Sequence, residues 1–273
     1  MTNPLQTILL GLLVISTGLA GCLTDTQAPQ DQEPPGPGPS DPARPEPVAS
    51  FSRTACTEHY GAFTMPHEEA EPYLPQGFTM VARSGAPITG PTAETFLLII
   101  HCEGDADHPP ATQAWAVLPV DPPEPYNAPD ATIQYVVMAG LVTNQTVHDL
   151  YASAWGLPRM AQGTATFEAS SPTPAAQAWD AELNVPGGRA TLSVTIPAAP
   201  GPFQGGLVRL FGVEDQQVTG IVDTLWSDQT GQSGAATLQD DGFMPVTVDG
   251  DGAGGVYTDF SIDFEQADLP EAA

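Results

Sequence analysis

Residues 179–196 read WDAELNVPGGRATLSVTI and consist of two alternating segments separated by a turn. In both segments every second residue is apolar, which indicates two strands that each have one buried and one wet face. The intervening Pro186-Gly187-Gly188 is typical of the tight turn of a β-hairpin. This stretch therefore predicts a β-rich fold.

Outside the hairpin, seven further segments have the composition of strands. They are Thr95–Cys102, Thr112–Val120, Ala131–Val142, Gly163–Ala169, Leu207–Glu214, Val218–Trp226 and Val256–Phe264. The first contains the continuous apolar run Phe96–Ile100, which indicates a central strand covered on both faces. Many short strands predict a single, mainly antiparallel barrel-like or sandwich domain over residues 51–273.

Only residues 144–155 have a convincing helical pattern. Asn144, or Thr143 before it, can cap the helix, and Gly156 and Pro158 can end it. Four residues fall on one apolar face: Val147, Leu150, Tyr151 and Ala154. A second, shorter helical turn is expected to begin at Pro66.

The segment from Ile133 to Thr166 resembles the acetoacetate decarboxylase family in the order of its elements. In that family a hydrophobic strand leads into a short helix, which ends in an aromatic residue or glycine, then proline and two lysines. The corresponding segments are Ile133–Met138, Asn144–Trp155 and Trp155-Gly156-Leu157-Pro158-Arg159-Met160. A weaker similarity covers Met65-Pro66 and Leu74-Pro75-Gln76-Gly77-Phe78. The resemblance implies a single-domain barrel-like fold that encloses an apolar pocket.

The chain departs from this family at the residues that carry its chemistry. By position the two lysines fall on Arg159 and Met160, and all six basic residues of the chain are arginines. Imine formation requires a neutral amine, whereas a guanidinium stays protonated. The family's catalytic glutamate would fall on Phe96–Ile100, where every residue is apolar. Schiff-base decarboxylation is therefore excluded, and no catalytic residue or cofactor is predicted.

The resemblance leaves four candidate ligand-binding residues: Arg159, Met160, Trp155 and His101. Arginine can bind a carboxylate through two hydrogen bonds, although in so acidic a chain it can equally pair with a structural carboxylate. The main hypothesis is a non-catalytic barrel that binds a small apolar or carboxylated ligand. One alternative is an enzyme with altered chemistry, in which Arg159 orients an anionic substrate. Another is a structural surface protein whose barrel is filled by side chains.

The first fifty residues have the composition of an export signal followed by a tether. Residues 1–21 resemble a lipoprotein signal peptide, because an apolar run precedes Leu19-Ala20-Gly21-Cys22. Lipidation is expected at Cys22. Residues 22–50 contain eight prolines among polar residues, which is typical of a disordered tether. The sequence thus predicts a lipid-anchored protein on the extracytoplasmic face of the cell membrane.

Cys56 and Cys102 remain as a pair in an oxidising compartment, where a disulfide is expected. A zinc site that uses Cys56, His59, His101 and Cys102 is the rival, but neighbours on a strand point to opposite faces. The run Asp249–Gly254 begins like a calcium loop, yet its fifth position is Ala253. No metal site is therefore predicted.

The chain has 33 acidic and 6 basic residues, a formal net charge of −27. Nucleic acid is not expected as a partner, because binding to phosphates needs a basic surface. At about 1 M salt the Debye length falls to roughly 3 Å, which removes most of the self-repulsion. The acidity therefore suits a halophilic protein, although an ordinary acidic exported protein would also fit.

Overall fold

The computed structural model describes residues 49–104, 109–173, 176–197 and 201–270. The expected signal peptide, the expected lipidation site at Cys22 and nearly all of the expected tether lie outside these residues. The described elements in chain order are β1 (Ala49–Pro66), α1 (His67–Ala70), η1 (Glu71–Tyr73), β2 (Thr79–Met80), β3 (Thr92–Cys102), β4 (Ala111–Asp121), β5 (Ala131–Val142), α2 (Gln145–Asp149), η2 (Leu150–Ala154), β6 (Met160–Gln162), β7 (Thr164–Thr173), β8 (Ala176–Val185), β9 (Gly188–Pro197), β10 (Gly201–Phe203), β11 (Leu207–Glu214), β12 (Gln217–Trp226), β13 (Gln229–Asp241) and β14 (Asp251–Ala267). Among the described residues no helix has the length and apolar composition that a membrane-spanning helix needs.

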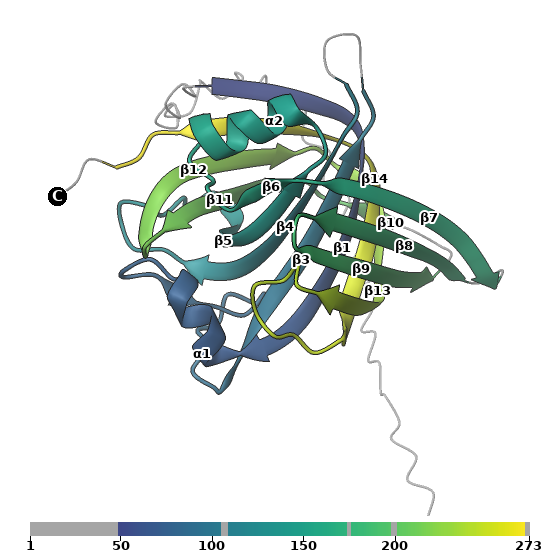
Figure 1. Ribbon diagram of the computed structural model, residues 1–273, viewed down its shortest axis with the longest axis horizontal. Helices are drawn as coiled ribbons and strands as arrows, with labels where there is room; N and C mark the ends of the chain where they lie inside the picture. Colours follow the sequence, from purple (N-terminus) through teal and green to yellow (C-terminus); the bar gives the residue numbers. More distant parts are fainter. Residues whose placement is uncertain (1–48, 105–108, 174–175, 198–200, 271–273) are drawn as a thin grey trace, which may run out of the picture. The chain divides into compact units, whose positions relative to one another are not determined.

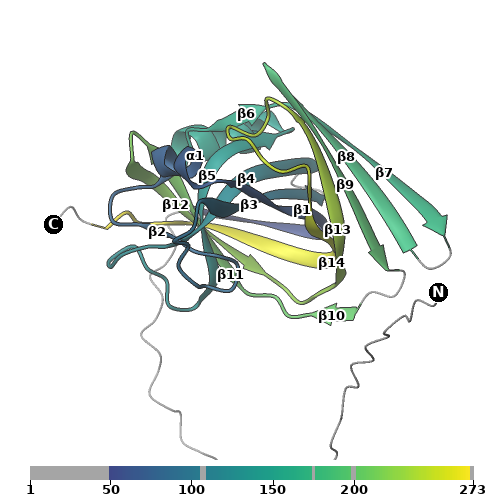
Figure 2. The same cartoon turned by 90° about the horizontal axis from the view of Figure 1, so that it is seen from below.

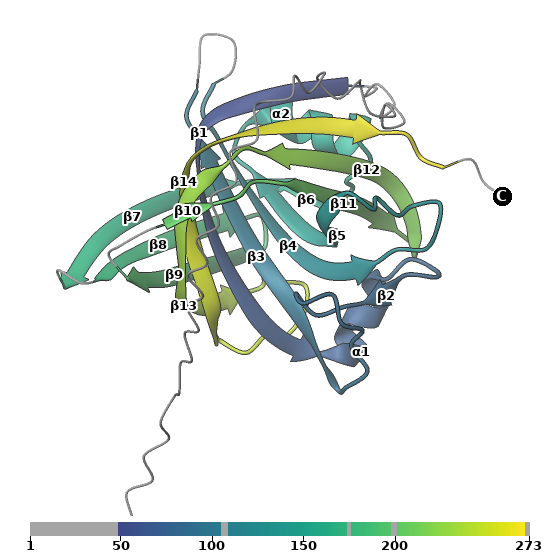
Figure 3. The same cartoon turned by 180° about the vertical axis from the view of Figure 1, so that it is seen from behind.

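The central part of the sheet closes on itself. Strands follow one another in the order β1-β3-β4-β5-β11-β12-β14, and β14 pairs back with β1 (Figures 1 and 3). All of these pairs are antiparallel except β5 with β11, which run parallel. The expected antiparallel barrel-like fold is therefore confirmed.

A second layer leaves the barrel at the first half of β14. From there β13, β9, β8 and β7 continue the sheet, and Figure 2 shows β7, β8 and β9 beside the barrel. The predicted hairpin is confirmed, because Val185 pairs with Gly188 across a turn at Pro186-Gly187. Its dry face, which includes Leu183 and Leu192, packs against the outer face of the barrel wall.

Strand β3 shows how alternation builds two cores at once. Phe96 and Leu98 point into the barrel and join one hydrophobic cluster, whereas Leu97 and Ile99 join the cluster under the second layer. These four side chains are all buried. The continuous apolar run is therefore explained by a strand with a core on each face, as expected.

The predicted helix is present but changes its winding halfway. Asn144 caps α2 by accepting a hydrogen bond from the amide of Val147 at 3.2 Å. From Leu150 to Ala154 the chain forms a π-turn. The wider turn rotates the later residues, so Tyr151 is buried while Ala154 is exposed, and the expected place of Ala154 on the apolar face is wrong. Gly156 then ends the helix with φ of +67°.

A disulfide joins β1 to β3, which confirms the predicted pair. Cys56 and Cys102 are cross-strand partners, and their sulfur atoms are 2.06 Å apart. Both residues are fully buried. The bond closes a loop with a sequence separation of 46, for which the chain-entropy model gives a stabilisation of roughly 3–4 kcal/mol.

Candidate functional site

One end of the barrel interior holds a cavity with a volume of about 200 Å³. Apolar walls come from strands that are distant in sequence but adjacent in the barrel. Its large apolar lining residues are Phe96, Leu98, Ile133, Val208 and Trp226. Phe203 at the end of β10 and the three residues after it, Gln204 to Gly206, also line the cavity. The barrel is therefore not completely filled by its own side chains.

A carboxyl group lies in this apolar cavity. Glu58 of β1 lines it and is only 6% exposed. Burial raises the pKa of the Glu58 carboxyl from its usual 4.5 to about 8, and the positive charge of Arg83 opposes part of that rise. A carboxyl with a pKa in this range exchanges a proton near neutral pH, which is typical of groups at functional sites.

Three tyrosines surround the carboxyl. Tyr257 of β14 is the cross-strand partner of Glu58, and its ring stacks on that of Tyr60 with centroids 5.6 Å apart. Tyr135 approaches from β5. Burial raises the pKa of the Tyr257 phenol to about 12, and burial raises that of Tyr135 further. Both phenols therefore stay protonated, and the hydroxyl of Tyr257 hydrogen-bonds with Tyr60 and Ser233.

Arg83 is an exposed residue that also lines the cavity, so it lies where the cavity meets solvent. Arg83 lines the cavity, and its Nη1 donates a hydrogen bond to the hydroxyl of Tyr60 at 3.3 Å. Its guanidinium also lies 5.2 Å from the centroid of the Tyr60 ring. The backbone amide of Arg83 donates to Glu94 Oε2 at 2.7 Å, so Glu94 fixes the loop that carries the guanidinium.

One buried polar atom of the cavity has no partner among the described residues. Gln229 lines the cavity and is 8% exposed, and its Oε1 accepts no hydrogen bond there. Buried acceptors of this kind are usually satisfied by protein, water or a ligand. The cavity thus offers an acceptor on one wall and an arginine at its mouth.

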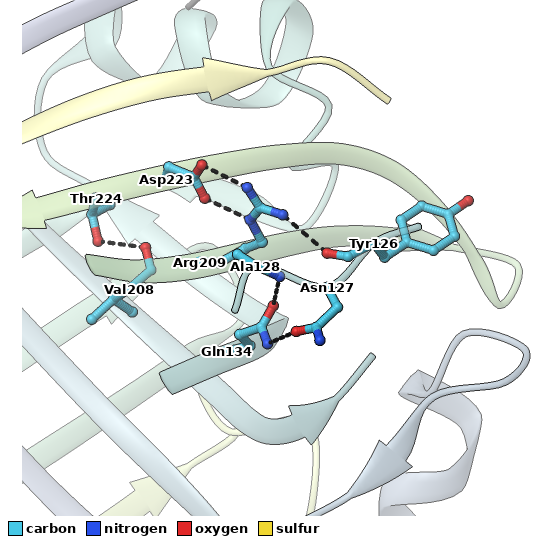
Figure 4. Close-up of polar contacts among 8 residues, drawn as sticks. All are labelled: Tyr126, Asn127, Ala128, Gln134, Val208, Arg209, Asp223 and Thr224. Atoms are coloured by element: carbon cyan, nitrogen blue, oxygen red, sulfur yellow. Dashed lines mark hydrogen bonds and ion pairs between the residues drawn. The ribbon is translucent and has the colours of Figure 1, made fainter. Parts of the chain in front are cut away.

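A polar network supports the wall from outside (Figure 4). Arg209 of β11 donates from Nε and Nη2 to the two oxygens of Asp223 of β12, at 2.7 and 2.8 Å. Its Nη1 donates to the carbonyl of Tyr126 at 3.0 Å. Gln134 holds the same segment through the amide of Ala128 at 3.1 Å. These bonds fix the connection that leads into β5, whose first residues line the cavity.

The four residues proposed from the family resemblance lie elsewhere in the barrel domain. The guanidinium of Arg159 stacks over Tyr73, 4.5 Å from the ring centroid. Trp155 is buried and stacks on Phe51 with centroids 5.4 Å apart, and Met160 is buried in the same interior cluster. None of these three residues lines the cavity.

His101, the fourth candidate, is also absent from the cavity lining. Its Nδ1 shares a hydrogen bond with the hydroxyl of Thr112 at 2.9 Å. The ligand-binding role of all four residues stays a prediction. The two ionisable residues Glu58 and Arg83 do line the cavity, but the sequence interpretation gave them no ligand-binding role.

The cysteines that a zinc site would need are joined in the disulfide. Within the described ranges there is no cluster of three or more His, Cys, Asp or Glu side chains that could hold a metal ion. In the run 249–254, Asp249 accepts a hydrogen bond from the hydroxyl of Thr64, and β14 begins at Asp251. This acidic run is thus tied into the sheet.

No protein-family model and no curated protein matches this sequence. A solved structure from structural studies of acetoacetate decarboxylase is similar in fold, with a TM-score of 0.50. The match covers 81% of this chain and 88% of that one, at 10% sequence identity. At this identity the similarity concerns the fold alone. The barrel domain therefore has an acetoacetate decarboxylase-like fold, as the order of elements in Ile133–Thr166 led us to expect.

Proposed function

We propose that the barrel domain binds a small, mostly apolar molecule that carries one carboxylate. The observation that supports this most directly is the cavity itself, whose walls are apolar and whose mouth holds Arg83. Apolar pockets with a few convergent polar groups are the usual form of small-molecule sites. An unfilled interior also argues against the alternative of a purely structural barrel.

Each polar group has a distinct part in this proposal. Arg83 receives the carboxylate, because a guanidinium presents two parallel donors to it. The Oε1 atom of Gln229 accepts from a hydroxyl or amide of the ligand, which supplies the missing partner. The volume of about 200 Å³ restricts the ligand to a short chain or a single ring.

Binding is expected to depend on Arg83 by a measurable factor. We expect Arg83→Gln to weaken the binding of short organic acids about 10- to 100-fold, because a hydrogen bond to a charged group is worth about 1.5–3 kcal/mol. Isothermal titration of a set of C4–C8 carboxylic acids on the purified full chain measures this. About 1 M salt should be used, since the net charge of −27 repels anions at low ionic strength.

Two controls make this test specific. The matched variant is Arg189→Gln, because Arg189 pairs with Glu182 on the protein surface and does not line the cavity. The matched ligand is the primary amide of the best acid, whose affinity should not change in Arg83→Gln. Failure of every acid to bind the unmodified chain would reject the proposed function.

The proposal includes a lipid anchor that holds the barrel outside the cell membrane. The support comes from sequence, namely Leu19-Ala20-Gly21-Cys22 after an apolar run and the proline-rich segment that follows. We expect cells that express the chain to incorporate labelled fatty acid into it, and Cys22→Ser to abolish the label. Equal labelling of Cys22→Ser, or no labelling of either protein, would contradict the anchor.

A further inference from the structure

We propose that the cavity also catalyses proton transfer at the carbon next to the ketone of a small oxo acid, with Glu58 as the general base. This inference rests on the proposed function, because it uses the same cavity and the same arginine. It adds a chemical step that requires neither a lysine nor a cofactor.

The placement of the groups supports the step. Glu58 and Tyr60 are two residues apart on β1 and both line the cavity, so their Cα atoms are separated by about 7 Å. The hydroxyl of Tyr60 accepts a hydrogen bond from Arg83, which lines the same cavity. We therefore expect a carboxylate bound at Arg83 to bring the carbon chain of a short oxo acid next to Glu58.

The phenols supply what an enolate needs. Tyr135 faces the cavity from β5, and Tyr257, which hydrogen-bonds with Tyr60 and Ser233, lies opposite Glu58 across the β1–β14 pair. Protonated phenols that donate to a developing oxyanion in a water-poor site stabilise the transition state strongly. Phe96 and Trp226 give the same space apolar walls.

The step balances without a further reactant. The Glu58 carboxylate takes the proton from the carbon, the C–H bonding pair forms the C=C bond, and the carbonyl π pair moves to oxygen. A phenol stabilises that oxygen by hydrogen bonding. Glu58 then returns the proton to carbon, or solvent deuterium reaches the carbon by the same route, so the net change is tautomerisation or isotope exchange.

Charged and titratable groups around Glu58 come from several elements. They are Arg83 at the mouth, Tyr60 on β1, Glu94 on β3, Tyr135 on β5 and Tyr257 on β14. Since burial holds the pKa of Glu58 at about 8, the carboxylate fraction grows with pH up to that value. The exchange rate at saturating substrate is therefore expected to rise between pH 6 and 8 and then to level off.

The test follows deuterium incorporation at C3 of 2-oxobutanoate and its longer homologues by proton NMR in D₂O with the full chain. We expect at least about 100-fold acceleration over buffer, the usual range for general acid–base catalysis. Glu58→Gln should lose that acceleration and the pH dependence while still binding the probe. The exposed Glu68→Gln, outside the cavity lining, is the matched control and should keep both.

Binding of each probe is measured in parallel by titration, which separates the two proposals. Binding without Glu58-dependent exchange would overturn the catalytic step and leave the binding function intact. Exchange that persists in Glu58→Gln would overturn it as well. If none of the oxo acids binds, the catalytic inference fails, and if the simple acids also do not bind, the proposed function fails with it.

Discussion

Replacing Glu58 with glutamine is expected to raise the free energy of unfolding by about 3 kcal/mol at pH 7. The carboxyl keeps its proton in the folded chain up to a pKa of about 8, whereas the unfolded chain loses it at about 4.5. When folding raises the pKa of a group, its contribution to stability is complete at pH values below the pKa of the unfolded chain. This contribution is lost as the pH rises to the pKa of the folded chain. Each pKa unit corresponds to 1.36 kcal/mol, so most of the loss has occurred by pH 7.

The variant should therefore differ from the natural chain in its pH profile. At pH 4 both side chains are uncharged and similar in shape, so the two proteins should unfold at nearly the same urea concentration. Above pH 5 their stabilities should separate, and the gap should reach about 4 kcal/mol near pH 8. Urea denaturation from pH 4 to 9 measures the gap, and parallel curves over that whole range would show that Glu58 is not a buried acid.

His59, the next residue of β1, makes stability depend on pH in the opposite direction. Its contribution cancels when Glu58→Gln is compared with the natural chain. Its side chain points away from the cavity and packs between Phe167 and Trp179, with centroids 5.4 and 5.2 Å away. Burial lowers the pKa of His59 from 6.5 to about 4. Stability from His59 is therefore complete above pH 6.5 and falls as pH drops toward 4, equally in both proteins.

The gain in stability expected for Glu58→Gln raises the question of why position 58 is a glutamate. Burial of the Glu58 carboxyl outweighs the nearby charge of Arg83, so Glu58 destabilises the fold at neutral pH, and glutamine or leucine would remove that penalty. Groups that reduce stability in this way concentrate at functional sites, where their chemistry requires it. The stability measurement thus tests whether the Glu58 carboxyl is a buried acid, and the exchange experiment tests whether the same carboxyl acts as a base.

Strands with a long apolar run could be predicted from the sequence. The bounds of β5 and β11 agree residue for residue with the segments inferred from composition. In each of these strands a run of apolar residues is buried on both sides, so the local signal and the final environment agree. The capped helix after β5 was predictable for the same reason, since Asn144 and Gly156 determine its ends locally.

Strand β1, which carries Glu58, was missed for a physical reason. Its pairing with β14 shifts register twice, between Arg53 and Cys56 and again between Cys56 and Glu58. Ala55 also adopts a φ of +49°. These irregularities break the alternation along the strand, and Glu58 and His59 are polar on opposite faces. A period-two pattern is therefore not visible in the sequence.

The arginine of the cavity could not be found from sequence at all. Family resemblance assigned the position to Arg159, which follows Pro158 and stacks on Tyr73 of η1. Arg83 instead lies in a turn after β2, and its place depends on Glu94 of β3 holding its amide. Such a long-range contact leaves no local pattern, so only the folded chain identifies the residue.

Replacing Arg209 with methionine is expected to lower the free energy of unfolding by about 3–5 kcal/mol. Asp223 is fully buried, and the guanidinium neutralises it through two hydrogen bonds. Removing the cation leaves a carboxylate in the interior, and it also deprives the carbonyl of Tyr126 of a donor. The loss should therefore exceed that of an ordinary surface substitution several-fold.

Arg189→Met provides the matched comparison. Arg189 also reaches a carboxylate at 2.7 Å, that of Glu182, but the two side chains are 54% and 39% exposed. Solvent screens this pair, so its removal should change stability by less than about 1 kcal/mol. Denaturation of both variants at pH 7 distinguishes the cases. Equal losses would mean that burial of Asp223 does not determine the strength of its pairing, and the support we assign to the cavity wall would then be wrong.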